Sequence, residues 1–229
     1  MNIGMRDFVY PALVLFLLLI ASPATVWAGN DPSSTSDYKH KYTFTTNWFV
    51  HKIPTWTNVL KDLKGKPDIQ YLEIGTFEGR SAIWVLENIL THPTARATII
   101  DGFEENTYKT FTSNLALSGE ASKVKIVSGL STEKMKEVPS NSIDFAYIDG
   151  SGKGIVMLSD LVNTWNALKV GGIIIVSRYE LNAYLRDALE MQPNEPGPIQ
   201  TIDAFLKLYK PYIKVLASEE NQVIIQKIR

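Results

Sequence analysis

Beyond residue 67, short apolar runs alternate with longer segments in which apolar residues recur at helical spacing. The short runs are rich in β-branched residues, and several end at a glycine or an acidic residue. They predict strands at 68–74, 97–100, 124–127, 143–148 and 173–176. The longer segments predict helices at 81–90, 108–117, 132–137 and 158–168, with residues 169–172 (KVGG) as the stop of the last. This alternation predicts βαβ units and a parallel sheet with helices on both faces.

The C-terminal end of the chain breaks this alternation. Residues 201–209 have a helical pattern, but the strand-like runs 212–216 and 222–228 follow with no helix between them. The connection at 217–221 (ASEEN) is short and polar. A parallel crossover needs a dozen or more residues, so these two strands are expected to pair antiparallel. The predicted sheet therefore has five parallel strands and a C-terminal antiparallel hairpin.

The N-terminal segment has the pattern of a targeting sequence rather than of a folded element. Residues 8–30 carry no charge, and the densest apolar run is 12–21. A proline-containing break and small residues before Gly29 predict a signal peptide, residues 1–28, and hence an exported protein. One alternative is an uncleaved membrane anchor, because the uncharged stretch approaches the ~20 residues of a membrane span, and another is a buried helix. Residues 29–45 are predicted as a linker, and 46–229 as the folded domain.

Composition excludes several classes of protein. Of 229 residues, 45% are hydrophobic and 21% charged, with a net charge of -1. This is ordinary globular composition, and it gives no broad attraction to nucleic acid or to an anionic membrane. The chain has no cysteine and only 3 histidines, so thiolate catalysis, disulfides and cysteine-ligated metals are excluded.

The turn after the first predicted strand is rich in glycine and lies beside acidic residues. It reads Glu73-Ile-Gly-Thr-Phe-Glu-Gly-Arg-Ser81. Glycine at 75 permits a tight turn, and glycine at 79 permits close backbone approach. Neither the dinucleotide pattern G-x-G-x-x-G nor the phosphate-binding G-x-x-x-x-G-K-[ST] is present. A carboxylate within the loop, at Glu78, favours a cationic or zwitterionic ligand over a polyphosphate.

The residues in this loop resemble the first motif of class I S-adenosylmethionine-dependent methyltransferases, acid-x-Gly-x-x-x-Gly. The resemblance continues through Ile100-Asp101-Gly102, 147–151 (YIDGS), 168–172 (LKVGG) and 202–205 (IDAF), and the terminal hairpin agrees with that fold. It covers roughly residues 55–228 and is nearest to small-molecule O-methyltransferases of the catechol O-methyltransferase kind. It implies an α/β, Rossmann-like, doubly wound sheet and S-adenosylmethionine as cofactor.

The resemblance also implies roles for individual residues. Glu73 and the loop would hold the methionine part, Asp101 the ribose hydroxyls, and 128–131 the adenine, while Asp149 would face the sulfonium and the transferred methyl. The implied cofactor-binding set is Glu73, Gly75, Thr76, Phe77, Gly79, Ser81, Asp101, Gly102, Ser128, Gly129, Leu130, Ser131 and Asp149. Asp149 and Tyr179 are the candidate catalytic residues, with Glu180 and His51 as weaker candidates for the base.

Simpler interpretations of these residues stay open. Glu73 could only cap the helix near Ser81, and Asp101 could be an ordinary turn residue before a glycine. Asp149-Gly150 is a common turn pair. His51, in a mixed apolar segment, is more typical of a structural residue than of a base.

The acceptor side departs from the family pattern. Relatives often have Asp-Gly-Ser-His after the fourth strand and two acids with a tyrosine after the fifth. This chain has Gly152 in the first motif and Ser177-Arg178-Tyr179 at the second. Hard divalent cations prefer several carboxylates, so no metal site is predicted. Arg178 could pair with Asp149 as a replacement charge, or strand alternation could turn it away.

Two functions of different classes follow. The first is a metal-independent methyltransferase acting on a small-molecule acceptor, with a hydroxyl as the expected target. The second is an exported, non-catalytic binding protein that retains the methyltransferase fold. A nicotinamide oxidoreductase is a distant third, because the glycine pattern is wrong for it. No nucleic-acid partner is expected, and a membrane partner only if the N-terminal segment stays uncleaved.

Overall fold

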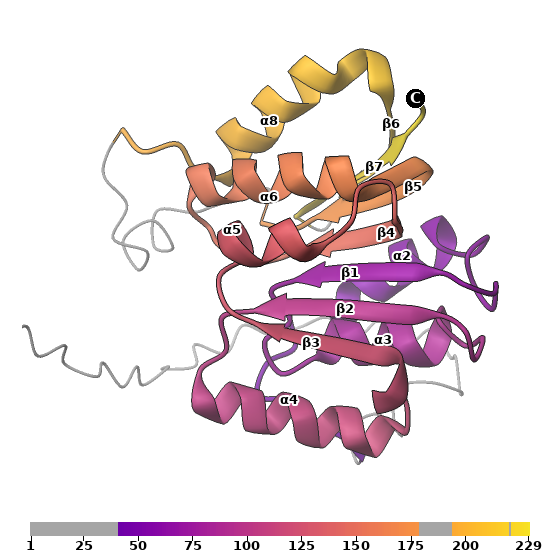
Figure 1. Cartoon of the computed structure of the whole chain (residues 1–229). Coiled ribbons are helices and arrows are strands. Elements are labelled where there is room, and N and C mark those ends of the chain that lie inside the picture. The colour runs from indigo at the N-terminus through magenta and orange to yellow at the C-terminus, as the bar shows by residue number, and fades with distance from the viewer. Residues whose placement is uncertain (1–40, 179–193, 220) are drawn as a thin grey trace, which may run out of the picture. The chain divides into compact units, whose positions relative to one another are not determined.

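The computed structural model describes residues 41–178, 194–219 and 221–229. Its centre is a seven-stranded sheet in the order β3-β2-β1-β4-β5-β7-β6 (Figure 1). The first five strands pair in parallel, and β7 runs antiparallel to both β5 and β6. The strands are β1 Gln70–Ile74, β2 Arg96–Asp101, β3 Val124–Ser128, β4 Ile143–Ile148, β5 Leu168–Val176, β6 Ile213–Glu219 and β7 Gln222–Lys227. The predicted fold class, with five parallel strands and a terminal hairpin, is confirmed.

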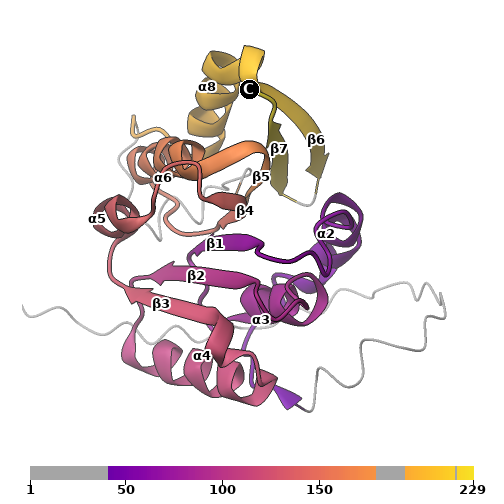
Figure 2. The same cartoon turned by 45° about the vertical axis from the view of Figure 1, so that its right-hand side comes forward.

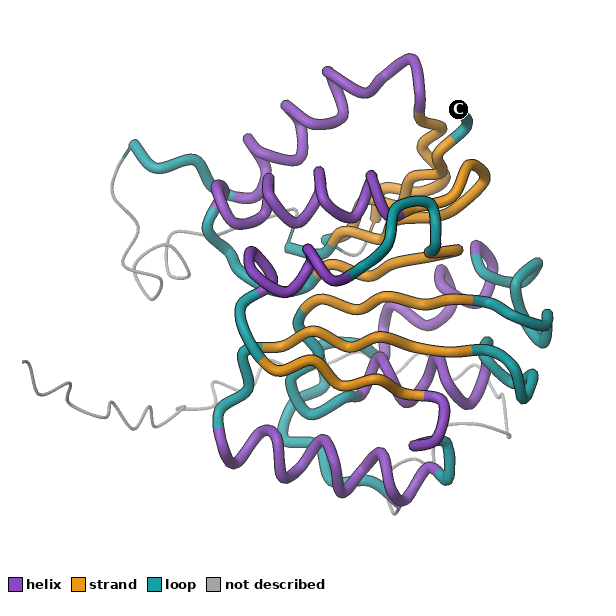
Figure 3. Tube along the Cα trace, viewed as in Figure 1, coloured by secondary structure: helices purple, strands orange, loops and turns teal. Residues whose placement is uncertain are grey.

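Helices cover both faces of this sheet (Figures 1, 2 and 3). One face packs against α2, α3 and α4, and the other against α6 and α8. The α-helices are α2 Ile53–Val59, α3 Arg80–Asn88, α4 Glu105–Ser118, α5 Ser131–Lys134, α6 Gly154–Ala167 and α8 Pro198–Tyr209. Short 3-10 turns are η1 Val50–Lys52, η2 Ala121–Lys123, η3 Met135–Glu137 and η4 Lys210–Tyr212.

Alternation along the central strands divides the core between these two faces. In β1, Tyr71 belongs to the core under α2 and α3, whereas Leu72 and Ile74 belong to the core under α6. Because helices cover both faces, the central strands are apolar at nearly every position, as parallel strands usually are. Glu73 is the buried polar residue of β1, and its side chain is fully enclosed, whereas Gln70 at the start of the strand is only partly buried.

The fifth strand begins earlier than the sequence pattern predicts. Residues 169–172, expected to stop a helix, lie inside β5, and the pairing of β4 with β5 is irregular between Ile143 and Phe145. Gly171 has a φ of 86°, and a Cβ on Gly172 would lie 2.9 Å from the Asp144 carbonyl oxygen. The two glycines therefore form a bulge within the strand, a role that a local sequence pattern does not separate from a helix stop.

The domain also begins earlier than the predicted residue 46. Within the predicted linker, Tyr42 is buried and its hydroxyl donates to Glu87, while the Thr43 and Thr45 amides donate to Asn114 Oδ1 and Glu78 Oε2 at 2.9 and 2.6 Å. These bonds fix residues 42–45 on α3, on α4 and on the loop that precedes α3, so this end of the predicted linker is part of the fold. The predicted signal peptide lies outside the described residues. Within the described ranges, no helix has the length and apolar character that spanning a membrane requires.

Candidate functional site

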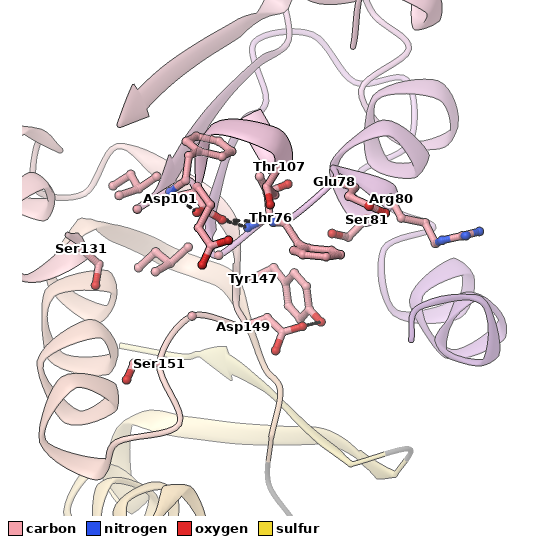
Figure 4. Close-up of a pocket in the computed structure, with 18 of the residues that line it drawn as sticks. Thr76, Glu78, Arg80, Ser81, Asp101, Thr107, Ser131, Tyr147, Asp149 and Ser151 are labelled. Carbon is pink, nitrogen blue, oxygen red and sulfur yellow. Dashed lines mark hydrogen bonds between the residues drawn. The ribbon is translucent and has the colours of Figure 1, made fainter. Parts of the chain in front are cut away.

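A cavity of about 590 Å³ opens at the carboxyl ends of the parallel strands (Figure 4). That volume is typical of a site for a small ligand. Most of the predicted cofactor-binding residues line it, namely Gly75, Thr76, Phe77, Ser81, Asp101, Gly102, Gly129, Leu130, Ser131 and Asp149. Three predicted residues, Glu73, Gly79 and Ser128, are not part of its wall. Tyr179 and Glu180 lie outside the described residues.

The glycine loop forms one wall of the cavity through its backbone. Gly75 has a φ of 81°, and a Cβ there would lie 2.6 Å from the main-chain oxygen of Asp149. The Gly75 amide donates to the Ile100 carbonyl at 2.9 Å. Glycine at 75 therefore allows the ends of β1 and β4 to meet. Gly79, with a φ of 86°, has a different role, because its Cβ would collide with the Phe111 ring at 2.4 Å.

Asp101, at the end of β2, ties two loops together beneath this wall. Its Oδ2 accepts hydrogen bonds from the Thr76 and Phe77 amides at 2.7 and 3.1 Å, and its Oδ1 accepts one from the Phe103 amide at 2.8 Å. An ionised carboxylate has about four lone-pair sites, so Asp101 keeps capacity for a ligand. It is thus more than the ordinary turn acid that the sequence left open.

Glu73 has a buried, internal role. Its Oε1 accepts from the Ser81 hydroxyl at 2.5 Å and its Oε2 from the Tyr71 hydroxyl at 2.8 Å. Burial raises the pKa of Glu73 from 4.5 to about 7, although the bonds from Ser81 and Tyr71 act in the opposite direction. The side chain thus holds the Ser81 hydroxyl at the start of α3 from behind the cavity wall. It differs from the capping role held open as an alternative, because α3 has no side-chain hydrogen bond at its N-cap. Contact of its carboxyl with a ligand stays a prediction.

The ends of β4 and β5 carry the polar groups on the predicted acceptor side of the cavity. Tyr147 and Asp149 both line the cavity, and the Tyr147 hydroxyl donates to Asp149 Oδ2 at 2.7 Å (Figure 4). Arg178 Nε donates to Asp149 Oδ1 at 3.0 Å. Arg178 has a φ of 63°, an uncommon conformation for a non-glycine residue, at the point where the chain leaves β5. Of the two orientations expected for Arg178, the pair with Asp149 is the one observed.

A buried lysine joins this group from the far end of the sequence. Lys52, on η1, is 6% exposed. Its Nζ donates to the Tyr147 hydroxyl at 3.2 Å and to Ser177 Oγ at 2.9 Å. Burial, followed by the nearby charge of Asp149, raises the pKa of Tyr147 well above its usual value, so the phenol stays protonated at neutral pH. The adjacent His51 is exposed and does not line the cavity.

The rest of the acceptor-side wall comes from the N-terminal segment. Phe44, Thr46, Trp48 and Phe49 line the cavity. The segment is held by Thr45, whose amide and hydroxyl donate to the two oxygens of Glu78, and by Arg80 Nη2, which donates to the Thr46 carbonyl at 2.7 Å. The sequence predicted only that the carboxylate of Glu78 disfavours a polyphosphate ligand. In the structure it also holds the N-terminal segment against the glycine loop.

Sequence reasoning missed this segment and the buried lysine. The run 44–56 is dense in aromatic residues, but no periodicity assigns it to a strand or a helix long enough to recognise. Lys52 and Tyr147 are 95 positions apart, and only the folded sheet brings them together. Among the described residues, no group of three or more acidic, histidine or cysteine side chains is placed to hold a metal ion.

Comparison with known proteins gives a family for the central part of the chain. Residues 72–177 match a family model described as a methyltransferase domain. No curated protein matches the sequence. Solved structures share the fold at low sequence identity.

Three of them show the range of these relatives. An O-methyltransferase from Bacillus cereus in complex with SAH is 20% identical, with a TM-score of 0.58 over 77% of this chain and 81% of that one. The O-methyltransferase TomG from Streptomyces achromogenes, in complex with SAM, is 19% identical, with a TM-score of 0.52 over 70% and 73%. A putative rRNA-methylase from Clostridium thermocellum is 13% identical, with a TM-score of 0.62 over 78% and 96%. Family model and fold together confirm the predicted resemblance to class I methyltransferases.

Proposed function

We propose that this chain, which carries a methyltransferase domain at residues 72–177, binds S-adenosylmethionine in the cavity and transfers its methyl group to a small-molecule hydroxyl acceptor. The observation that carries the proposal is the convergence of the glycine loop, Asp101 and Asp149 on one cavity of about 590 Å³. Solved structures of the same fold that hold SAM or SAH support this choice of cofactor.

The residues present fit such a cofactor. Gly75 keeps the strand ends close where any side chain would separate them. Asp101 accepts three amide hydrogen bonds with about four lone-pair sites, so it retains acceptor capacity for one ligand hydroxyl. Gly129, whose amide donates to the Asp101 carbonyl at 2.9 Å, lines the cavity together with Ser131, where the adenine is expected. When bound, the cofactor supplies an electrophilic methyl group on a sulfonium centre. Asp149 is the carboxylate on the acceptor side of the cavity.

The acceptor side supports catalysis by orientation. Thr46, Trp48 and Phe49 form a wall that Glu78 and Arg80 fasten to the glycine loop, so a bound acceptor would lie between this wall and the polar group at Tyr147 and Asp149. Holding two reactants in line can supply about 7–11 kcal/mol of barrier reduction. With the cofactor held by the glycine loop and Asp101, the methyl group that it supplies would pass to an acceptor hydroxyl placed beside Tyr147 and Asp149, and the acceptor's proton would leave to water.

Calorimetric titration with S-adenosylmethionine and S-adenosylhomocysteine tests the cofactor assignment. We expect micromolar dissociation constants, equivalent to about 7–8 kcal/mol. Asp101→Asn should weaken both ligands by about 10-fold or more, because a charge-assisted acceptor is lost. Failure of the unmodified protein to bind either ligand would reject the proposal.

The second candidate is a non-catalytic binding protein, favoured by the altered residues after β4 and β5. Transfer of labelled methyl groups into a panel of small hydroxyl compounds distinguishes the two. Binding of the cofactor with no transfer to any compound, alone or in host extract, would favour the binding protein.

Export by residues 1–28 is a further part of the proposal. It rests on the uncharged segment and the small residues before Gly29. N-terminal sequencing of the protein from its host should begin at Gly29. A membrane-bound protein that retains residues 1–28 would establish the anchor, and a soluble, full-length cytoplasmic protein would exclude both.

A further inference from the structure

The polar group at the ends of β4 and β5 has a fixed direction of hydrogen bonding. A lysine ammonium has only donors, and an ionised carboxylate has only acceptors. Tyr147 has one hydroxyl hydrogen, so it accepts from Lys52 and donates to Asp149. Arg178 donates to the other oxygen of the same carboxylate. Two cationic side chains thus act on Asp149, Arg178 directly and Lys52 through one hydroxyl.

Burial makes this group rigid. Lys52, Tyr147 and Ser177 are 6%, 2% and 3% exposed, and Ser177 Oγ provides a second acceptor for the lysine. Trp56 packs edge-on against the Tyr147 ring, with centroids 4.7 Å apart, and further restricts its rotation. Asp149 is the member that faces the cavity with a partly exposed carboxyl, 27% of its side chain being accessible.

We infer that Lys52 is a positioning residue that acts through Tyr147 and, with Arg178, weakens the negative charge that Asp149 presents to the sulfur of the bound cofactor. This inference rests on the proposed function, since it assigns the charge balance of that same site. Methyl transfer turns a positive sulfonium into a neutral thioether. An uncompensated carboxylate would stabilise the sulfonium more than the transition state, in which that charge is already declining, and would raise the barrier. Positive charge behind Asp149 reduces this ground-state stabilisation.

The preference for S-adenosylmethionine over S-adenosylhomocysteine measures this balance, because the two ligands differ by the methyl group and its charge. Lys52→Met removes a cation two hydrogen bonds from the carboxylate. Calorimetry should show the ratio of the two affinities shifting toward the sulfonium by about fivefold or more, the effect of a unit charge at this range inside a protein. Asp149→Asn should shift the ratio in the opposite direction.

Matched variants separate this role from a structural one. Lys61→Met makes the same chemical change at an exposed position of the chain and should leave the ratio unchanged. Lys52→Arg keeps a cationic donor and should keep the ratio within about twofold of the unmodified protein. Loss of packing alone would weaken both ligands equally, leaving the ratio as it was.

Tyr147→Phe gives a second test that retains the lysine. It breaks the connection to Asp149, and the ratio should again move toward the sulfonium. This variant decides the question if Lys52→Met does not fold, as judged by its thermal unfolding. Equal ratios in the unmodified protein, Lys52→Met and Tyr147→Phe would overturn the inference while leaving the cofactor assignment intact. Failure of the unmodified protein to bind either ligand would instead reject the proposed function.

Discussion

The two sides of the cavity are built in different ways. The side proposed for the cofactor, called the cofactor side below, consists of the turn after β1 and the ends of β2 and β3. It exposes mainly backbone groups that glycines and Asp101 hold in place. The acceptor side consists of side chains from the N-terminal segment and from the ends of β4 and β5. Lys52 and Ser177, which meet there, are 125 positions apart in the chain.

This difference decides which part of the site a short sequence pattern can identify. Backbone geometry at a strand–helix turn is encoded within a few residues, and it can be recognised wherever those residues recur. A side-chain network depends on tertiary packing, so the same fold can present different acceptor sides. The family model spans residues 72–177, which include the glycine loop and the ends of β4 and β5, whereas Lys52 and the rest of the N-terminal segment lie outside it. We therefore expect that segment to distinguish this chain from other proteins that share the fold.

The largest expected effect comes from a methyl group on the cofactor side. Gly75→Ala places a Cβ 2.6 Å from the Asp149 carbonyl oxygen, at a φ of 81°. The ends of β1 and β4 would have to separate, and overpacking of this kind costs about 1–3 kcal/mol or more, where about 2.7 kcal/mol equals 100-fold in affinity. We expect S-adenosylhomocysteine to bind at least about 100-fold more weakly, measured by calorimetry.

Gly119→Ala is the matched control. Gly119 has nearly the same backbone angle, 79°, but nothing lies within 4 Å of its added Cβ. Both variants carry the backbone penalty of about 1–2 kcal/mol for a left-handed alanine, which cancels in the comparison. Equal loss of binding in the two would show that Gly75 acts through backbone strain rather than through the close contact of two strands.

The sequence predicted the sheet well because its strands are short, continuously apolar runs that end at glycines or acids. Residues 143–148 were assigned with the observed bounds, since burial on both faces leaves few alternatives for such a run. The start of β5 was wrong, because Gly171 and Gly172 form a bulge that resembles a helix stop. The edge of the domain at residues 42–45 was also missed, since its contacts are all long-range.

In the site, local sequence motifs identified the glycine loop and the strand ends that line the cavity, but not the side chains that pack around them. Asp101 and Gly75 line the cavity as expected, while Glu73 lies behind the wall because strand alternation turns it under α3. Lys52 carries no local signal, since a lysine in an aromatic segment is ordinary. Only its burial against Tyr147 marks it as part of the site.

An effect of intermediate size is expected on the free energy of unfolding, which should depend on pH because the carboxyl of Glu73 is buried. Its pKa is about 7 when folded and 4.5 otherwise, so the folded state binds the proton more tightly. The stabilising contribution is complete below pH 4.5 and is lost as the pH rises through about 7, by about 3 kcal/mol in total. The free energy of unfolding of Glu73→Gln, relative to that of the unmodified protein, should therefore rise by about 3 kcal/mol between pH 4.5 and pH 7.

Urea denaturation at a series of pH values measures this gain. Glu105→Gln is the matched control, because it makes the same chemical change on a side chain that is 81% exposed, so it removes no buried carboxyl. If the free energies of unfolding of Glu73→Gln and the unmodified protein vary with pH in the same way, burial does not raise the pKa of Glu73, and the prediction is wrong. Asp160, whose burial raises its pKa from 3.8 to about 6, contributes a trend of the same sign in both proteins and cancels in the difference.

The smallest expected effect concerns divalent cations on the acceptor side. Both oxygens of Asp149 already accept protein hydrogen bonds, from Tyr147 and Arg178, and the neighbouring Ser177 accepts from Lys52. Magnesium retains most of its waters unless carboxylates or phosphates replace them, so this arrangement favours no ion. We expect a chelator to change the affinity for S-adenosylhomocysteine by less than about twofold, because only the loss of a bound ion would change the charge of the site.

Arg178→Asp reverses one charge and adds a second carboxylate. Electron paramagnetic resonance spectra of added manganese should therefore show binding in that variant and none in the unmodified protein. A stoichiometric manganese ion in the unmodified protein that is lost in Asp149→Asn would contradict this prediction. The acceptor side would then bind a metal ion through Asp149, in place of the hydrogen bonds from Arg178 and Tyr147. The two sides of the cavity would differ because one of them binds a metal, and not because one uses backbone groups and the other side chains.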